Sequence, residues 1–167
     1  MIDKKYRLVI CGGTFDHLHE GHKAFLRAAF IRGERVIIGL TSYNMIKNKP
    51  FPEKIQKYEE RLTNLIKFLK EENVFENSTI VKIDDPYGPS ITLENAEAII
   101  VTEETKHRAY EINKIREKRD LKKLEIVIVP FLYGSNGKRI SSSQERENEN
   151  MPRKTKLWRN IKNGEVL

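Results

Sequence analysis

Three histidines and an aspartate lie within one short stretch near the N-terminus, GGTFDHLHEGH at residues 12–22. The stretch follows the apolar run YRLVIC and precedes KAFLRAAFIRG. This pattern predicts a strand at 6–11, a turn, and a helix at 20–32 that Gly33 closes. Ligands of open α/β sheets bind beyond the carboxyl ends of the strands, so this turn lies where a ligand would bind.

The residue types of this turn suit the phosphate groups of a ligand. Gly12 and Gly13 permit a close approach of the backbone or a positive φ. The start of the helix offers unpaired N–H groups and the positive end of the helix dipole to an anion. His19 and His22 are three positions apart, so both imidazoles lie on one helix face and can donate to phosphate oxygens. We predict a phosphate site built without the lysine of a P-loop.

Simpler interpretations of the same residues stay open. Two glycines after a strand are often only a tight turn. Asp16 could cap the helix or hold an N–H group of a loop. His17, His19 and His22 could bind a metal, but no carboxylate or cysteine elsewhere completes an obvious ligand set, and we predict no metal held by the protein.

The composition predicts a soluble globular protein. Hydrophobic residues make up 38% and charged residues 33% of the 167 residues, which is enough apolar material for one sizeable core. No apolar run approaches the roughly 20 residues of a membrane span, and the first residues show no secretory pattern. Cys11 is the single cysteine, which fits a reducing compartment. We therefore expect a cytoplasmic protein without a membrane partner.

The positive charge is concentrated at the C-terminal end of the chain. The net charge is +7, and residues 151–167 contain five basic residues against one acidic residue. Basicity that is mostly a property of the tail does not imply nucleic acid as a partner. Leu157, Trp158 and Ile161 form a narrow apolar stripe in this tail. We expect one domain at 1–150 and a basic C-terminal helix at 151–167 that docks on it.

Hydrophobic patterning predicts the elements that position the turn. Continuous apolar runs predict four further strands, at 35–41, 78–84, 96–102 and 124–131. Helical spacing predicts helices at 57–72 and up to about residue 119, and further helices beginning with ISSS and with Pro152. The segment 42–56, with two prolines, reads as a long loop with a function. This order is typical of a doubly wound, parallel five-stranded α/β fold of the Rossmann-like kind.

The turn carries the GTFD…HxGH signature and resembles the nucleotidylyltransferase superfamily. The longer pattern over residues 6–146 resembles the archaeal and eukaryotic type of phosphopantetheine adenylyltransferase, through IGLTS, KYEERLTNLIKFL, DPYGP, IIVTEET, INKIR and ISSS. The resemblance implies transfer of AMP from ATP to 4′-phosphopantetheine, which gives 3′-dephospho-coenzyme A and pyrophosphate. It also implies Mg²⁺ bound with the ATP phosphates.

The resemblance implies roles for individual residues. Thr14 contacts the attacking phosphate, and His22 with His19 steadies the α- and β-phosphates of ATP. A loop lysine closes over the phosphates, and both Lys47 and Lys49 are candidates for this lysine. Lys49 is the one to which we assign a catalytic role. Acceptor binding falls to Thr14, Lys47, Lys49 and Arg116. Nucleotide binding falls to Gly12, Gly13, Phe15, His22, Ser141, Ser142, Ser143 and Arg146.

Two other classes of function stay open at this point. One is another nucleotidylyltransferase, with FMN, nicotinamide mononucleotide or glycerol 3-phosphate as the acceptor. The other is a non-catalytic nucleotide-binding module, against which the presence of Thr14, His19 and His22 together argues. In the serine motif, Ser143 stands where the family usually has threonine. The sequence leaves undecided whether the protein is a monomer or a homo-oligomer.

Overall fold

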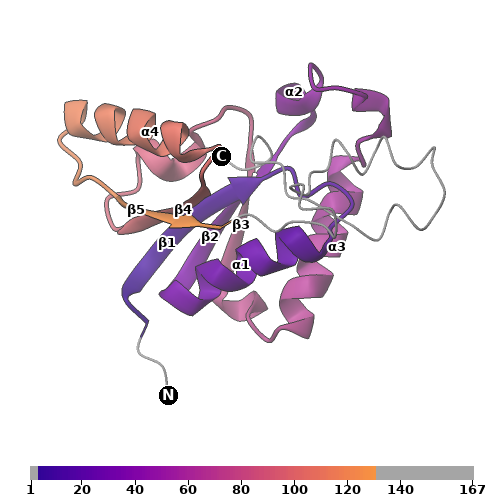
Figure 1. The fold of residues 1–167 in the computed structure, drawn as a ribbon, viewed down its shortest axis with the longest axis horizontal. Helices are drawn as coiled ribbons and strands as arrows, with labels where there is room; N and C mark the ends of the chain where they lie inside the picture. The colour runs from indigo at the N-terminus through magenta and orange to yellow at the C-terminus, as the bar shows by residue number, and fades with distance from the viewer. Residues whose placement is uncertain (1–3, 131–167) are drawn as a thin grey trace.

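The computed structural model describes residues 4–130, which build one parallel sheet flanked by helices (Figure 1). The sheet has five strands in the order β3-β2-β1-β4-β5, and every neighbouring pair is parallel. The strands are β1 (Tyr6–Gly13), β2 (Gly33–Thr41), β3 (Ser78–Ile83), β4 (Ala98–Thr102) and β5 (Glu125–Val129). The predicted doubly wound, Rossmann-like sheet is therefore confirmed.

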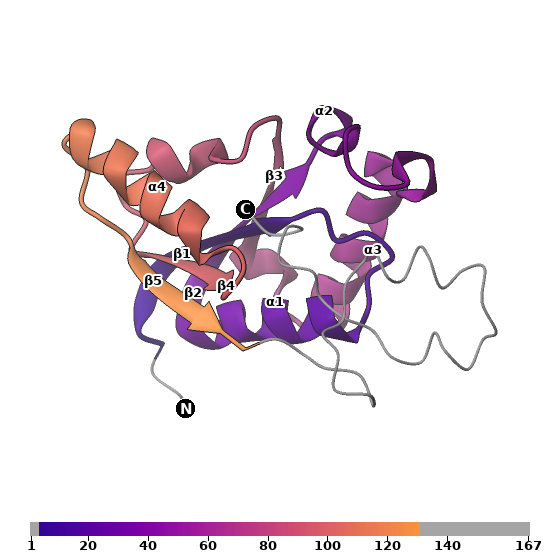
Figure 2. The same ribbon diagram turned by 45° about the horizontal axis from the view of Figure 1, so that its top comes forward.

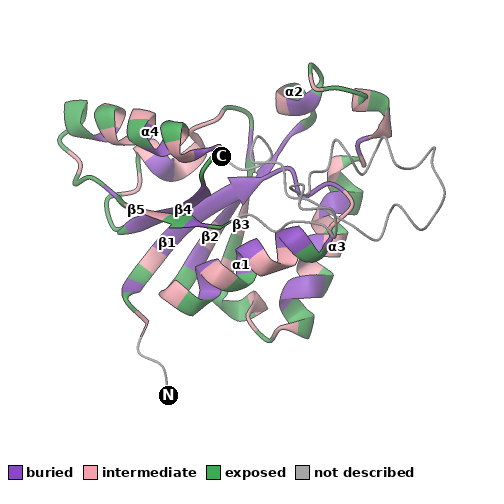
Figure 3. Cartoon of the chain, in the orientation of Figure 1, coloured by how far each residue is buried: buried purple, intermediate pink, exposed green. Residues whose placement is uncertain are grey.

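Helices cover both faces of this sheet. α1 (Glu20–Arg32) and α3 (Tyr58–Glu71) pack on one face, and α4 (Lys106–Lys118) packs on the other (Figures 1 and 2). The central strands β1, β2 and β4 are the most buried parts of the sheet (Figure 3). Burial on both faces explains why these strands are continuous apolar runs rather than alternating ones. Among the described residues, no helix is long and apolar enough to cross a membrane.

The direction of strand addition reverses at β1. The chain adds β2 and β3 on one side of β1, and then returns to add β4 and β5 on the other side. The connections that leave β1 and β4 therefore diverge to opposite faces, which opens a crevice at the carboxyl ends of these strands. The turn that follows Gly13 lies at this switch point.

The segment 42–56 contains more structure than the predicted loop. It holds α2 (Tyr43–Ile46) and a 3₁₀ helix, η1 (Pro52–Lys54), which starts with a proline at its first position. Ile46 and Ile55 are buried and fix both ends of the segment to the domain. Two further 3₁₀ helices, η2 (Phe75–Asn77) and η3 (Gly88–Ile91), flank β3.

Gly33 ends α1 as predicted, but it does so in extended backbone, with φ −112°, and it is also the first residue of β2. A Cβ atom at this position would lie 2.7 Å from Cγ2 and 2.9 Å from Cγ1 of Val9. Val9 is completely buried and has no room to move. Glycine is required here by close packing against β1.

Replacing Gly33 with alanine is expected to destabilise the protein by about 1–3 kcal/mol, the usual cost of overpacking a core. Denaturant unfolding of the wild type and of Gly33→Ala measures this difference. In a Val9→Ala background the same substitution should cost less, because the clashing methyl groups are gone. An unchanged unfolding free energy in Gly33→Ala would contradict this account of the helix–strand junction.

Several expectations concern residues outside the described range. They are the helices that begin with ISSS and with Pro152, the domain limit at residue 150 and the docked tail at 151–167. Four of the expected nucleotide-binding residues lie outside it as well: Ser141, Ser142, Ser143 and Arg146.

Candidate active site

The Thr14 hydroxyl lies at the centre of the strand-to-helix turn and accepts two hydrogen bonds. Oγ1 of Thr41 donates at 2.9 Å, and Nζ of Lys49 donates at 3.1 Å. Thr14 is completely buried, and Thr41 is the last residue of β2. The register of the two strands pairs Gly13 with Leu40, so the next residues, Thr14 and Thr41, leave neighbouring strands side by side. The structure thus brings a hydroxyl and an ammonium group together at the switch point.

A buried arginine on α3 holds this pair of strand ends. Nη1 of Arg61 donates to the carbonyl oxygens of Thr14 at 3.0 Å and of Thr41 at 2.8 Å. Its Nε donates to the carbonyl oxygen of Gln56 at 3.0 Å. Only 1% of Arg61 is exposed. Sequence reasoning missed Arg61, although one signal was present: it lies four residues before Leu65, within the buried stripe of an amphipathic helix.

His19 and His22 cap the first turn of α1 reciprocally. Nδ1 of His19 accepts a hydrogen bond from the N–H of Gly21 at 3.1 Å, and Nδ1 of His22 accepts from the N–H of His19 at 3.3 Å. The two rings stack with centroids 3.8 Å apart. A backbone N–H can only donate, so each Nδ1 is an acceptor and the proton of each neutral ring is on Nε2. Both imidazoles can therefore offer an N–H donor to a phosphate oxygen.

His22 is held in the neutral form. Burial, and after it the electrostatic effect of the neighbouring His17 and Lys49, lowers its pKa from 6.5 to about 3. Only 1% of the residue is exposed, and the ring of Phe15 contacts the ring of His22 edge-on, with centroids 5.5 Å apart. Because the ring is buried, a hydrogen bond from its neutral N–H group to an anion is stronger than it would be in water, and no proton has to be transferred.

Lowering the pH is expected to destabilise the protein through His22. Its pKa is about 3 in the folded protein, against 6.5 for an unperturbed histidine, so unfolding takes up a proton between these values. The contribution of His22 to the free energy of unfolding is complete above pH 6.5. Below this pH it falls by about 1.4 kcal/mol per pH unit. Denaturant unfolding from neutral pH down to about pH 4 measures the slope. In His22→Gln the slope of the free energy of unfolding against pH should be smaller by the contribution of one proton. An equal slope in both proteins would refute the assignment.

The connection 54–56 braces the turn from outside. Oδ1 of Asp16 accepts a hydrogen bond from the N–H of Gln56 at 2.8 Å, and the N–H of His17 donates to Oε1 of Gln56 at 2.9 Å. Asp16 is completely buried, so the interpretation of this aspartate as a holder of a loop N–H is confirmed. Phe15 and His17 have positive φ values of 50° and 48°, which are rare for residues other than glycine. The brace keeps the turn in this strained path.

Gly12 and Gly13 belong to the end of β1 and pair with Gly39 and Leu40 of β2. They lack positive φ, because Gly88 is the only glycine of the described range that has it. Close approach of the backbone is the option that remains for them.

Lys47 and Lys49 differ in their exposure and in their contact with the turn. Lys47 is exposed, whereas Lys49 is half-buried and donates to Thr14. Ile46 and Ile55, which are both buried, lie on either side of Lys49 in the chain and anchor the segment that carries it. The structure therefore brings Lys49, and not Lys47, together with Thr14.

Arg116 is not brought to this site. It lies in the last turn of α4, which runs back from the carboxyl end of β4 (Figure 1). The residue is completely buried, and its guanidinium donates to backbone carbonyl oxygens of Ser90, Leu93 and Lys122 at 2.7–2.9 Å. Burial lowers its pKa. In the described part of the chain Arg116 ties α4 to the connection between β3 and β4, which is a structural role.

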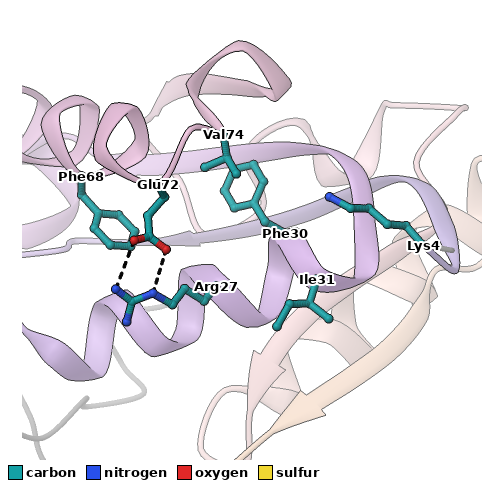
Figure 4. Close-up of a pocket in the computed structure, with 7 residues that line it drawn as sticks. All are labelled: Lys4, Arg27, Phe30, Ile31, Phe68, Glu72 and Val74. Carbon is teal, nitrogen blue, oxygen red and sulfur yellow. Dashed lines mark hydrogen bonds and ion pairs between the residues drawn. The ribbon is translucent and has the colours of Figure 1, made fainter. Parts of the chain in front are cut away.

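Two cavities lie between α1 and α3. The polar one, of about 510 Å³, adjoins the turn and is lined in part by His17, Lys23 and Gln56. The apolar one, of about 370 Å³, is drawn in Figure 4 and is lined by Lys4, Arg27, Phe30, Ile31, Phe68, Glu72 and Val74. Arg27 and Glu72 form a bidentate ion pair at its edge, at 2.8 and 3.2 Å. These lining residues come from outside the turn 12–22, so the apolar cavity is not part of the candidate site.

The chemistry of the turn does not fit a metal ion held directly by the protein. Apart from the Asp16 carboxylate, which accepts the N–H of Gln56, its described polar groups are a hydroxyl, an ammonium group and imidazoles, whereas Mg²⁺ prefers several oxygen ligands that carry negative charge. Within residues 4–130 there is no group of three or more His, Cys, Asp or Glu side chains that could hold a metal.

The fold and this turn together define an α/β protein of the nucleotide-binding kind, with hydrogen-bond donors gathered at the switch point of the sheet. Residues 10–148 match the family described as cytidylyltransferase-like. A phosphopantetheine adenylyltransferase of Thermococcus kodakarensis is 49% identical over 140 residues, which cover 84% of this chain and 84% of that protein. The Pyrococcus furiosus phosphopantetheine adenylyltransferase is 51% identical over 140 residues, which cover 84% and 87%.

A solved structure shares the fold of this chain. The crystal structure of a protein of unknown function from Archaeoglobus fulgidus aligns with a TM-score of 0.65 and 32% identity, over 74% of this chain and 88% of that chain. The chain therefore belongs to the cytidylyltransferase-like family and, within it, to the phosphopantetheine adenylyltransferases, which are nucleotidyltransferase enzymes.

Proposed function

We propose that this protein transfers the adenylyl group of ATP to 4′-phosphopantetheine, a step of coenzyme A biosynthesis. An oxygen of the 4′-phosphate attacks the α-phosphorus of ATP, the bond from this phosphorus to the bridging oxygen of the β-phosphate breaks, and pyrophosphate leaves. The other product is 3′-dephospho-coenzyme A. The names of relatives that share about half of their residues with this chain support the proposal.

The contact between Lys49 and Thr14 is the observation that carries the proposal. It sets an ammonium group 3.1 Å from a buried hydroxyl at the switch point of the sheet. The attacking phosphate is already a nucleophile, so no covalent enzyme intermediate is needed. The barrier arises mainly from repulsion between two polyanions and from their alignment, which fixed cationic and N–H donors lower. Thr14 and Lys49 would bind the attacking phosphate.

The neighbouring histidines would hold the triphosphate. Nε2–H of His22, with that of His19, would donate to oxygens of the α- and β-phosphates, where negative charge builds up on the leaving pyrophosphate. Gly12 and Gly13 let the backbone approach, and Phe15 fixes the ring of His22. The resemblance of the ISSS motif supports a second phosphate contact from the segment that holds Ser141, Ser142, Ser143 and Arg146.

Mg²⁺ would arrive with ATP, bound to phosphate oxygens and water, because this ion retains several waters and needs few protein ligands. It would neutralise part of the triphosphate charge. No step assigned above to a side chain depends on its position. A cytoplasmic location, where ATP is available, belongs to the same proposal.

Pyrophosphate release tests the assignment. The purified protein is incubated with ATP or CTP and one acceptor at a time: 4′-phosphopantetheine, FMN, nicotinamide mononucleotide or glycerol 3-phosphate. ATP with 4′-phosphopantetheine is expected to react fastest by at least about 100-fold, because a site built for one acceptor leaves polar groups unpaired with another. Faster turnover of CTP with glycerol 3-phosphate would overturn the proposal.

A further inference from the structure

We propose that Thr41 is a positioning residue that orients the hydroxyl group of Thr14 toward the acceptor phosphate. The inference rests on the proposed function, because it assigns a task to Thr14 in that reaction. The site would then include a residue at the end of β2 in addition to the residues of the turn after β1. Thr41 itself need not touch the substrate.

The direction of the hydrogen bonds follows from groups that can only donate. The guanidinium of Arg61 and the ammonium of Lys49 have no acceptor atoms. Nη1 of Arg61 lies 3.4 Å from Oγ1 of Thr41, so the Thr41 oxygen faces a donor and its own proton is directed to Oγ1 of Thr14 at 2.9 Å. Lys49 donates to the same Thr14 oxygen at 3.1 Å.

The Thr14 hydroxyl has one proton left after this arrangement. Because its oxygen accepts from two sides, the proton is directed away from both Thr41 and Lys49. A hydroxyl with both acceptor positions used can serve only as a donor to a further group. An oxygen of the 4′-phosphate is the anionic acceptor that the proposed reaction brings to this place.

Burial makes this orientation persistent. Thr14 is completely buried and Thr41 is 4% exposed, so little water competes for the hydroxyl groups. Arg61 fixes the two residues by their carbonyl oxygens, which prevents the strand ends from moving apart. A donor that is already oriented costs no reorganisation when charge develops in the reaction.

The decisive variant is Thr41→Val, which keeps the shape of the side chain and removes its hydroxyl group. We expect kcat/KM for 4′-phosphopantetheine to fall by about tenfold, the usual effect of one hydrogen bond. The KM for ATP should change by less than about twofold, since Thr41 acts on the acceptor side. Thr41→Ser retains the hydroxyl group and should recover activity to within about threefold of the wild type. Thermal unfolding of both variants identifies any loss of folded protein.

A double-mutant cycle with Thr14→Val separates positioning from a merely structural role. If Thr41 acts through Thr14, adding Thr41→Val to Thr14→Val should leave kcat/KM unchanged within about twofold. A second, independent tenfold loss would overturn the inference, and so would full activity of Thr41→Val. The wild type is assayed in parallel, because inactivity of the wild type with ATP and 4′-phosphopantetheine would instead refute the proposed function.

Discussion

Replacing His22 with asparagine is expected to slow adenylyl transfer by about 100- to 1,000-fold, the typical cost of losing one donor that faces developing charge. Asparagine can keep an acceptor near the position of Nδ1, which takes the N–H of His19 at 3.3 Å in the wild type. It has no group at the position of Nε2. The variant therefore removes the proposed phosphate donor and keeps the helix cap. Pyrophosphate release and thermal unfolding are measured on the same preparation.

Two further substitutions at this position serve as controls. His22→Gln places an amide N–H near the position of Nε2 and should retain more activity than the asparagine variant. His22→Ala removes both the donor and the cap, and it opens space beside Phe15, so it should lose activity and also some stability. A loss of less than about tenfold in His22→Asn would rule out the role in charge stabilisation.

The second large effect is expected for Lys49. Lys49→Met keeps the aliphatic stem and removes the ammonium group that donates to Thr14 at 3.1 Å. We expect kcat/KM to fall by about 100-fold or more, because two polyanions must then approach without this charge. Steady-state rates with ATP and 4′-phosphopantetheine varied separately show on which substrate the loss falls.

Lys47 provides the matched comparison for Lys49. It has the same side chain and lies two residues earlier in the same segment, but it is exposed. Lys47→Met should reduce kcat/KM by less than about threefold, since an exposed charge is screened by water and salt. Equal losses in the two methionine variants would mean that the contact between Lys49 and Thr14 has no special part in the reaction.

The structure also explains why an unusual backbone path can persist in the turn. Phe15 and His17 both have positive φ, which costs non-glycine residues free energy. The buried carboxylate of Asp16 holds the N–H of Gln56, and Gln56 in turn accepts from the N–H of His17. These two contacts link the turn to the segment that carries Lys49. The same brace therefore shapes the turn and sets the approach of the loop.

Local sequence determined the strand, the turn and the first helix. The apolar run before Gly12 predicts a buried parallel strand, and the three-residue spacing of His19 and His22 places both rings together at the start of α1. These features depend on neighbours within one helical turn or one strand, so periodicity and spacing are sufficient to read them. The signature GTFD…HxGH carried the family resemblance because it lies wholly within this continuous unit.

Only the tertiary structure decided which distant groups join the turn. Arg61 contacts carbonyl oxygens of residues 47 and 20 positions earlier, Thr14 and Thr41, and its place in an amphipathic helix does not reveal these partners. The choice between Lys47 and Lys49 depends on how buried side chains anchor the loop. Arg116 instead binds carbonyl oxygens of the connection between β3 and β4. A charged side chain is placed by the donors and acceptors that packing brings to it, and that packing depends on contacts far apart in the sequence.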